Sequence, residues 1–183
     1  MPISILKPSG KPQVKKSISK RQPVYIGIDP GLGITGYGIL EKAGKEIIIR
    51  EAGFIRTDRK ASMESRIAEI YHGINEVITE FKPELVIIED LYSHYRHPKT
   101  AIIMGHARGA VYLSAATAGL NVKSYGATMI KKSLTGNGRA SKLQVQTMIK
   151  SKLGLKTLPE PPDVADALAV ALCHISHLEN GVS

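Results

Sequence analysis

Residues 24–40 read Val-Tyr-Ile-Gly-Ile-Asp-Pro-Gly-Leu-Gly-Ile-Thr-Gly-Tyr-Gly-Ile-Leu: an apolar run that ends in a carboxylate, a Pro-Gly turn and a second apolar run. Runs of β-branched and aromatic residues bounded by Gly and Pro predict strands, here Val24–Asp29 and Ile34–Leu40. A third such run, Ile47–Arg56, follows the short segment Lys42-Ala-Gly-Lys45. This spacing predicts an antiparallel three-stranded meander.

The pattern changes after the meander. Apolar residues recur at steps of three and four from Met63 to Phe81, which predicts an amphipathic helix that stops before Pro83. The run Glu84–Glu89 is apolar on both faces and predicts a central, parallel strand. The remaining elements are predicted as a helix over Thr100–Ala118, a strand over Asn121–Tyr125, and helices over Ser141–Leu153 and Asp163–His177. Three strands, a helix and then alternating strands and helices indicate an α/β sandwich with a mixed sheet.

Two glycines in the second predicted helix, Gly105 and Gly109, are interpreted as allowing close packing of that helix on the sheet. The alternative interpretation is a contact between two subunits.

Charge is strongly segregated along the chain. Residues 1–22 carry six basic residues and no acidic one, and without apolar periodicity they predict a disordered basic tail, either a DNA tether or a solvated extension. The 69 residues from Leu91 to Pro159 contain no Asp or Glu and eleven basic residues. Segregation of one sign on this scale indicates a polyanionic partner, most commonly nucleic acid. The basic residues of that span are Arg96, Lys99, Arg108, Lys123, Lys131, Lys132, Arg139, Lys142, Lys150, Lys152 and Lys156.

Several classes of protein are excluded by composition. The single cysteine, Cys173, excludes a disulfide framework within the chain and suits a reducing compartment. The most apolar helix candidate contains His106 and Arg108, which argues against a membrane span, and the polar start lacks a signal peptide. The expected location is therefore the cytoplasm, in association with the nucleoid.

Four carboxylates stand where apolar residues would favour folding. Asp29 and Glu89 end strands, and ligands bind beyond the carboxyl ends of neighbouring strands. Asp163 and Asp166, three residues apart at the start of an otherwise apolar helix, lie on one side of it. With the basic span, they predict two hard cations, Mg²⁺ or Mn²⁺, beside a phosphodiester. Structural interpretations stay open: a helix N-cap for Asp163, a turn for Asp29 and a polar strand end for Glu89.

Four segments together resemble the bacterial RuvC-type Holliday junction resolvases. They are Ile26–Gly38, Val86–Glu89, Gly105–Gly109 (Gly-His-Ala-Arg-Gly) and Asp163–His174, which begins Asp-Val-Ala-Asp-Ala-Leu-Ala. The resemblance implies that residues 23–183 form a ribonuclease H-like nuclease domain, a mixed five-stranded sheet flanked by helices. It also implies a homodimer that nicks symmetric strands of a four-way junction, with branched DNA as its partner and a branch-migration motor as a further candidate partner.

The resemblance also assigns roles to residues. It implies that Asp29, Glu89, Asp163 and Asp166 are catalytic, and that Lys131 and Lys142 act at the scissile phosphate, where a lysine offsets transition-state charge. Tyr92 corresponds to an aromatic residue that stacks on junction bases, with Tyr95 as a competitor for that role. The expected DNA contacts are Tyr92, Arg96, Arg108, Lys131, Lys132, Arg139 and Lys142.

Three alternatives compete with this interpretation. One is an ATPase fragment of the actin and sugar-kinase superfamily, although the chain shows no second phosphate hairpin. Another is a nucleic-acid-binding domain without catalysis, in which the carboxylates are structural. The third, within the same fold, is a ribonuclease that cuts DNA–RNA hybrids. A soft-metal site at His94, His97, His174 and His177 has little support, because no cysteine or tight histidine cluster accompanies them.

Overall fold

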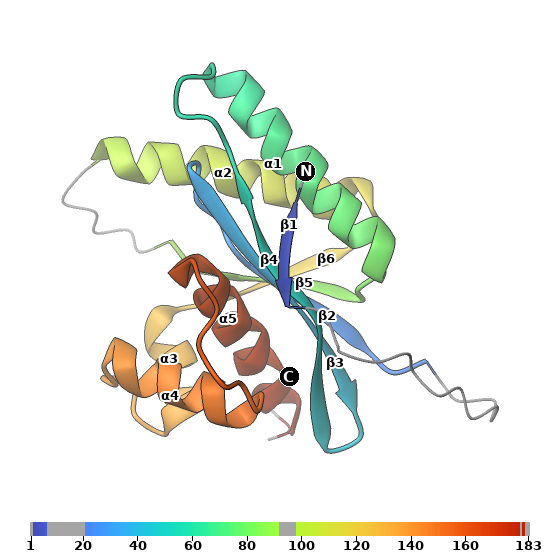
Figure 1. Cartoon of the computed structure of the whole chain (residues 1–183), viewed down its shortest axis with the longest axis vertical. Coiled ribbons are helices and arrows are strands. Elements are labelled where there is room, and N and C mark those ends of the chain that lie inside the picture. The colour runs from blue at the N-terminus through green and yellow to red at the C-terminus, as the bar shows by residue number, and fades with distance from the viewer. Residues whose placement is uncertain (1, 7–20, 92–97, 180, 182–183) are drawn as a thin grey trace.

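The computed structural model describes residues 2–6, 21–91, 98–179 and 181, and its centre is a mixed sheet with strand order β1-β4-β3-β2-β5-β6 (Figure 1). The strands are β1 (Ile3–Leu6), β2 (Val24–Asp29), β3 (Ile34–Ala43), β4 (Glu46–Arg56), β5 (Leu85–Glu89) and β6 (Asn121–Tyr125). β2, β3 and β4 form the predicted antiparallel meander, and β5 and β6 extend it in parallel. The predicted mixed sheet of five strands is confirmed by β2 to β6.

Helices cover both faces of the sheet (Figure 1). They are α1 (Met63–Phe81), α2 (Pro98–Thr117), α3 (Ala127–Thr135), α4 (Lys142–Lys152) and α5 (Pro162–Glu179). Successive residues of a strand point to opposite faces, so Ile26 and Ile28 join the core under α1 and α2, whereas Tyr25 and Ile87 join the core under α3, α4 and α5. In the described part of the chain, no helix is long and apolar enough to cross a membrane.

α5 lies almost directly on β2 and β3, because glycines face it. A Cβ atom added to Gly27 would lie 2.1 Å from the Ala167 carbonyl oxygen, and one added to Gly36 would lie 2.1 Å from the Asp163 carbonyl oxygen. Neither distance is possible for a real side chain. The glycines of these two strands therefore bring the start of α5 to the end of β2.

The interpretation of Gly105 and Gly109 as helix–sheet packing residues is wrong. Both are exposed, and a Cβ atom on either would meet no heavy atom within 4 Å. The close approach is made by α5 instead, where glycines on the strands rather than on the helix provide the space.

Two elements were not predicted. β1 pairs antiparallel with β4, the outer strand of the meander, with Ile3 opposite Phe54, although residues 1–22 were predicted to be a disordered tail. The apolar run Ile3–Leu6 can pair there because an edge strand presents unpaired backbone groups. Residues 7–20 of that tail lie outside the described residues. α3 was missed because nine residues are too few to show a clear helical period.

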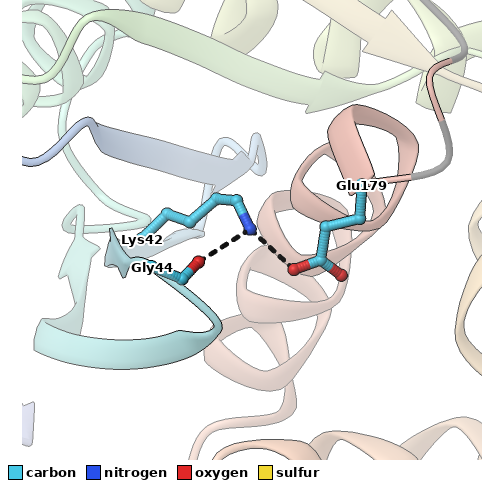
Figure 2. Close-up of polar contacts among 3 residues, drawn as sticks. All are labelled: Lys42, Gly44 and Glu179. Atoms are coloured by element: carbon cyan, nitrogen blue, oxygen red, sulfur yellow. Dashed lines mark hydrogen bonds and ion pairs between the residues drawn. The ribbon is translucent and has the colours of Figure 1, made fainter.

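The C-terminal end of α5 is attached to the β3–β4 hairpin (Figure 2). The Lys42 ammonium group donates to the Gly44 carbonyl oxygen at 3.2 Å and lies 2.6 Å from a carboxylate oxygen of Glu179. This ion pair is exposed, so it contributes at most about 1 kcal/mol. The glycine contacts along α5, rather than this pair, determine where the helix lies.

Candidate active site

Sheet topology brings the two strand-end carboxylates to one edge. β2 and β5 are parallel neighbours, with Ile28 opposite Ile88, so Asp29 and Glu89 leave the sheet side by side. Asp29 is paired across the meander with Gly36, and Gly36 contacts the backbone of Asp163. The first turns of α5 therefore lie over the same edge, as the sequence predicts.

The carboxylates interact electrostatically. Burial, together with the charges of Asp166, Asp163 and Glu89, raises the pKa of Asp29 to about 7 against the opposing charge of Lys142. Burial and the Asp166 charge also raise the pKa of Glu89. All four predicted acidic residues thus lie within one electrostatic neighbourhood.

Both predicted lysines lie beside these carboxylates. A capping box between Ser141 and Gln144 fixes the first turn of α4, which begins at Lys142. The Lys142 ammonium group lies 3.1 Å from a carboxylate oxygen of Asp166. Lys131, on α3, opposes the rise in the pKa of Glu89. These two lysines, Glu89 and Asp166 line one cavity of about 210 Å³.

Glu89 also lines a second cavity. Its volume is about 350 Å³, and Asp29, Glu89, Asp90 and Arg108 are among the residues that line it. Glu89 lines both cavities, so it connects the two lysines and Asp166 of the first with Asp29 of the second.

The predicted DNA contacts fall into three groups. Lys132 and Arg139 are exposed close to Lys131 and Lys142 along the chain. Tyr92, its competitor Tyr95, and Arg96 lie outside the described residues, as do His94 and His97.

Arg108 is a different case, because its residue is only 8% exposed. Its guanidinium group donates to the backbone carbonyl oxygen of Glu89 instead of facing solvent. The structure thus gives Arg108 a partner on the protein backbone, and its expected contact with DNA stays a prediction. α2 packs with this residue inward, beside the end of β5.

A polar network behind the Pro-Gly turn was not predicted from the sequence. The Thr57 hydroxyl donates to the Leu32 carbonyl oxygen at 2.5 Å, and Arg66 donates to the same oxygen at 3.2 Å and to the Thr57 hydroxyl at 3.0 Å. This network ties the turn after Asp29 to α1. No spacing signal in the sequence joins Leu32, Thr57 and Arg66, because the contact depends on how α1 packs.

The four carboxylates fit a hard cation by donor type and charge. They supply only oxygen ligands, which Mg²⁺ and Mn²⁺ prefer, and a bound cation would relieve the mutual repulsion that raises the pKa of Asp29. Among the described residues, however, no three acidic, histidine or cysteine side chains form a ready-made cage for a metal ion. The ion pair between Lys142 and Asp166 holds one of the candidate ligands.

Comparisons with known proteins agree with the geometry. The family model for crossover junction endodeoxyribonuclease RuvC matches residues 25–174. The RuvC enzyme of Rhodopirellula baltica is 48% identical over 148 residues, which cover 81% of this chain and 83% of that protein.

Solved structures give the same result. Thermus thermophilus RuvC in complex with Holliday junction substrate has a TM-score of 0.83 at 35% identity, covering 87% of this chain and 97% of that one. The yeast mitochondrial Holliday junction resolvase Ydc2, at 14% identity and a TM-score of 0.63, covers 90% of this chain and 84% of that one and shares its fold. These neighbours confirm the expected ribonuclease H-like architecture.

Proposed function

The chain belongs to the family of crossover junction endodeoxyribonuclease RuvC, and on that premise we propose how its residues cut a four-way junction. It is a Holliday junction resolvase and a metal-dependent nuclease. In the proposed reaction, each of two subunits nicks one of two symmetric strands. The ATPase fragment and the non-catalytic binding domain are not favoured.

One observation carries the assignment of the active site. Asp29 is a half-buried carboxylate whose pKa is raised to about 7 by burial and by three further carboxylates. Such a group costs stability when it is ionised, and clustered perturbed carboxylates are typical of functional sites. Asp29, Glu89, Asp163 and Asp166 are therefore proposed as the cation ligands and catalytic residues.

The proposed cofactor is a pair of Mg²⁺ or Mn²⁺ ions. When bound beside the carboxylates, such ions orient the attacking water and stabilise charge on the attacking and leaving oxygens. The protein's own contribution is to hold Asp29 and Glu89 at adjacent strand ends and to present Asp163 and Asp166 from α5.

The two lysines are proposed to act on the scissile phosphate. Lys142 is exposed and paired with Asp166, so when DNA enters it can exchange the carboxylate for a phosphate oxygen. Lys131 lines the same cavity as Glu89 and interacts with it electrostatically. Positive charge at these positions would offset the negative charge that develops on the phosphorus oxygens in the transition state.

DNA is proposed to lie over α3 and α4. Lys132 and Arg139 are exposed on this surface and would contact the phosphate backbone.

Tyr92 is proposed to stack on a base near the crossover, which requires its ring and not its hydroxyl. Tyr92→Ala should therefore reduce the preference for junction over duplex, whereas Tyr92→Phe should cut like the parent. If Tyr92→Ala keeps the preference for junction over duplex, either Tyr95 stacks on the base or no tyrosine does.

The proposed dimer contact is the outer face of α2. Ile102, Tyr112 and Leu113 are 62%, 43% and 54% exposed and recur at helical spacing along one side. Gly105 and Gly109 on the same side leave open space in which a second helix can approach. A twofold dimer would bury this patch on both subunits and present two active sites to a junction with near-twofold symmetry.

Sedimentation of two variants tests the dimer. Leu113→Glu should yield monomers that cut a junction poorly, because a buried charge at the contact is costly. Ile48→Glu, a matched change of an exposed residue on β4, should stay dimeric. A Leu113→Glu variant that stays dimeric and fully active would show that the subunits meet at another surface.

The activity is tested with three substrates: a mobile four-way junction, a linear duplex and a DNA–RNA hybrid, each with Mg²⁺ or Mn²⁺. Paired symmetric nicks in the junction, with little cutting of the duplex, are expected. Asp166→Asn should abolish cutting while junction binding persists. Asp58→Asn, at an exposed aspartate, is the matched control and should cut normally. Faster cutting of the hybrid would indicate a ribonuclease instead.

The cellular setting follows from the substrate. Because branched DNA is the proposed partner, we place the enzyme in the cytoplasm in association with the nucleoid. A branch-migration motor is a candidate partner at the same junction.

A further inference from the structure

We propose that Arg108 is a positioning residue that holds the end of β5, and with it Glu89, in the arrangement needed to bind the cation and cut DNA. The inference rests on the proposed role of Glu89 in the carboxylate site. It assigns Arg108 a place inside the protein rather than on the DNA.

The contact is made at the point where regular pairing stops. The parallel pairing of β5 with β2 extends to Ile88, and Glu89 is paired only with Tyr125 of β6. On the β6 side, the backbone amide of Asp90 donates to the Tyr125 carbonyl oxygen at 2.9 Å. The Arg108 guanidinium group binds the Glu89 carbonyl oxygen from α2. The peptide group between Glu89 and Asp90 is thus tied to β6 through its amide and to α2 through its carbonyl.

The surroundings of Arg108 suit this role. The residue is 8% exposed and lines the same cavity as Asp29 and Glu89. Its guanidinium carbon lies 5.7 Å from the centroid of the Tyr112 ring. A planar guanidinium group presents its donors in a fixed fork, so it constrains the peptide group more tightly than a flexible ammonium group would. Because the Glu89 side chain leaves from the same residue, a small shift of this peptide group changes where the carboxylate lies.

Positioning has a different signature from phosphate binding. A residue that orients a ligand affects metal affinity by about 10–100-fold without touching the metal, and a misplacement of about 1 Å reduces a rate by about 100-fold. A phosphate contact instead changes DNA affinity and lowers the log–log salt slope by about one unit.

The experiment measures three quantities for the full-length protein: Mn²⁺ affinity without DNA by electron paramagnetic resonance, the single-turnover cleavage rate at saturating protein, and the salt slope of junction binding. Arg108→Gln should weaken Mn²⁺ binding and slow cleavage by at least about tenfold each, with the salt slope of the parent. Arg139→Gln should lower the slope by about one unit. Arg50→Gln, an exposed arginine on β4, is the matched control and should leave all three quantities unchanged.

If Arg108→Gln does not fold, Arg108→Lys decides the question, because it keeps the charge and most of the volume. It should weaken Mn²⁺ binding several-fold, since the fork is lost. Parent-like Mn²⁺ binding and cleavage in the folded variant, or a salt slope that falls as in Arg139→Gln, would overturn the proposal.

Glu89→Gln separates the positioning role from the carboxylate site on which it depends. If Glu89→Gln loses Mn²⁺ binding while Arg108→Gln does not, the positioning role alone fails. If Glu89→Gln binds Mn²⁺ like the parent, the carboxylate site of the proposed function fails.

Discussion

Asp29 and His174 are ionisable residues whose environments shift their pKa values in opposite directions. Asp29 has a raised pKa because it is buried among other carboxylates. His174 lies under the sheet, where its Nδ1 and the Tyr125 hydroxyl form a hydrogen bond of 2.8 Å. Burial and then the charge of Lys123 lower the pKa of His174 to about 4. Each shift links the stability of the fold to pH.

Without divalent cations, Asp29 should destabilise the protein at neutral pH. A carboxyl group with a raised pKa in the folded state contributes stability that is complete below its ordinary pKa near 4 and is lost as pH rises through about 7. At pH 8 the free energy of unfolding of Asp29→Asn should therefore exceed that of the parent by a few kcal/mol at most. The variant should unfold at a higher temperature, although it no longer cuts DNA.

Thermal unfolding at pH 4 and pH 8, with EDTA and with Mg²⁺, checks this expectation. Mg²⁺ should reduce the difference, because binding to the folded parent stabilises it. Asp58→Asn serves as the control. If the stability difference between Asp29→Asn and the parent does not change with pH, ionised Asp29 does not destabilise the fold.

His174 has the opposite dependence. A histidine with a lowered pKa in the folded state contributes stability that is present above its ordinary pKa near 6.5 and is lost as pH falls towards about 4. His174→Gln should have a lower free energy of unfolding than the parent at pH 8. This difference between variant and parent should be smaller at pH 4 by roughly 1–3 kcal/mol. Urea denaturation at both pH values measures the gap, with Tyr125→Phe to isolate the hydrogen bond. A gap that does not change with pH would contradict the assignment.

At the scale of elements, the site depends on how closely α5 approaches β2 and β3. Leu168 of α5 packs on Gly38 as Ala167 packs on Gly27, so the helix has almost no room to shift. α2 is the contrasting element, because its glycines face outwards. The same residue type thus has two roles that only the packing distinguishes.

A matched pair of glycine substitutions tests this contrast. Gly36→Ala places a Cβ atom 2.1 Å from the Asp163 carbonyl oxygen, so α5 must move. We expect a loss of several kcal/mol, beyond the usual range of about 1–3 kcal/mol for overpacking, and loss of cutting. Gly109→Ala should instead leave the folding of the monomer unchanged or stabilise it by about 0.5–1 kcal/mol. Chemical denaturation measures both, and equal effects would show that α5 is not confined by the strands.

At the scale of the whole molecule, charge is distributed unevenly. The chain carries a formal net charge of +9, and its long acid-free span forms the helices beside the active site. Eight of the 16 acidic residues lie in α1 and in the carboxylate site. A surface of this kind attracts DNA from a distance and orients it.

Junction affinity should therefore fall steeply with salt. Combined substitution of Lys131, Lys132, Arg139 and Lys142 by Gln should lower the log–log salt slope by about one unit for each phosphate group that the variant no longer binds. Lys45→Gln, on the hairpin between β3 and β4, is the control. Fluorescence anisotropy over a range of KCl concentrations gives the slopes, and an unchanged slope in the fourfold variant would place the DNA on another face.

Much of this architecture could be predicted from the sequence. The predicted strands Val24–Asp29 and Asn121–Tyr125 and the helix Met63–Phe81 have the bounds of β2, β6 and α1. These elements have strong periods and clear boundaries, such as the turn at Pro30 and the stop before Pro83. The four carboxylates could be picked out because Asp29 and Glu89 end apolar strands and Asp163 and Asp166 begin an apolar helix, where only a partner or a function compensates for burial of a charge.

Other features were determined only by the tertiary structure. Arg108 belongs to a basic span and resembles its neighbours there, yet α2 turns it inward onto Glu89. The glycines of β2 and β3, not those of α2, allow the close helix contact. The pairing of β1 and the network of Arg66, Thr57 and Leu32 join segments that are far apart in the sequence. Periodicity reports whether a residue is buried within its own element, whereas its partner depends on which elements meet and at what distance.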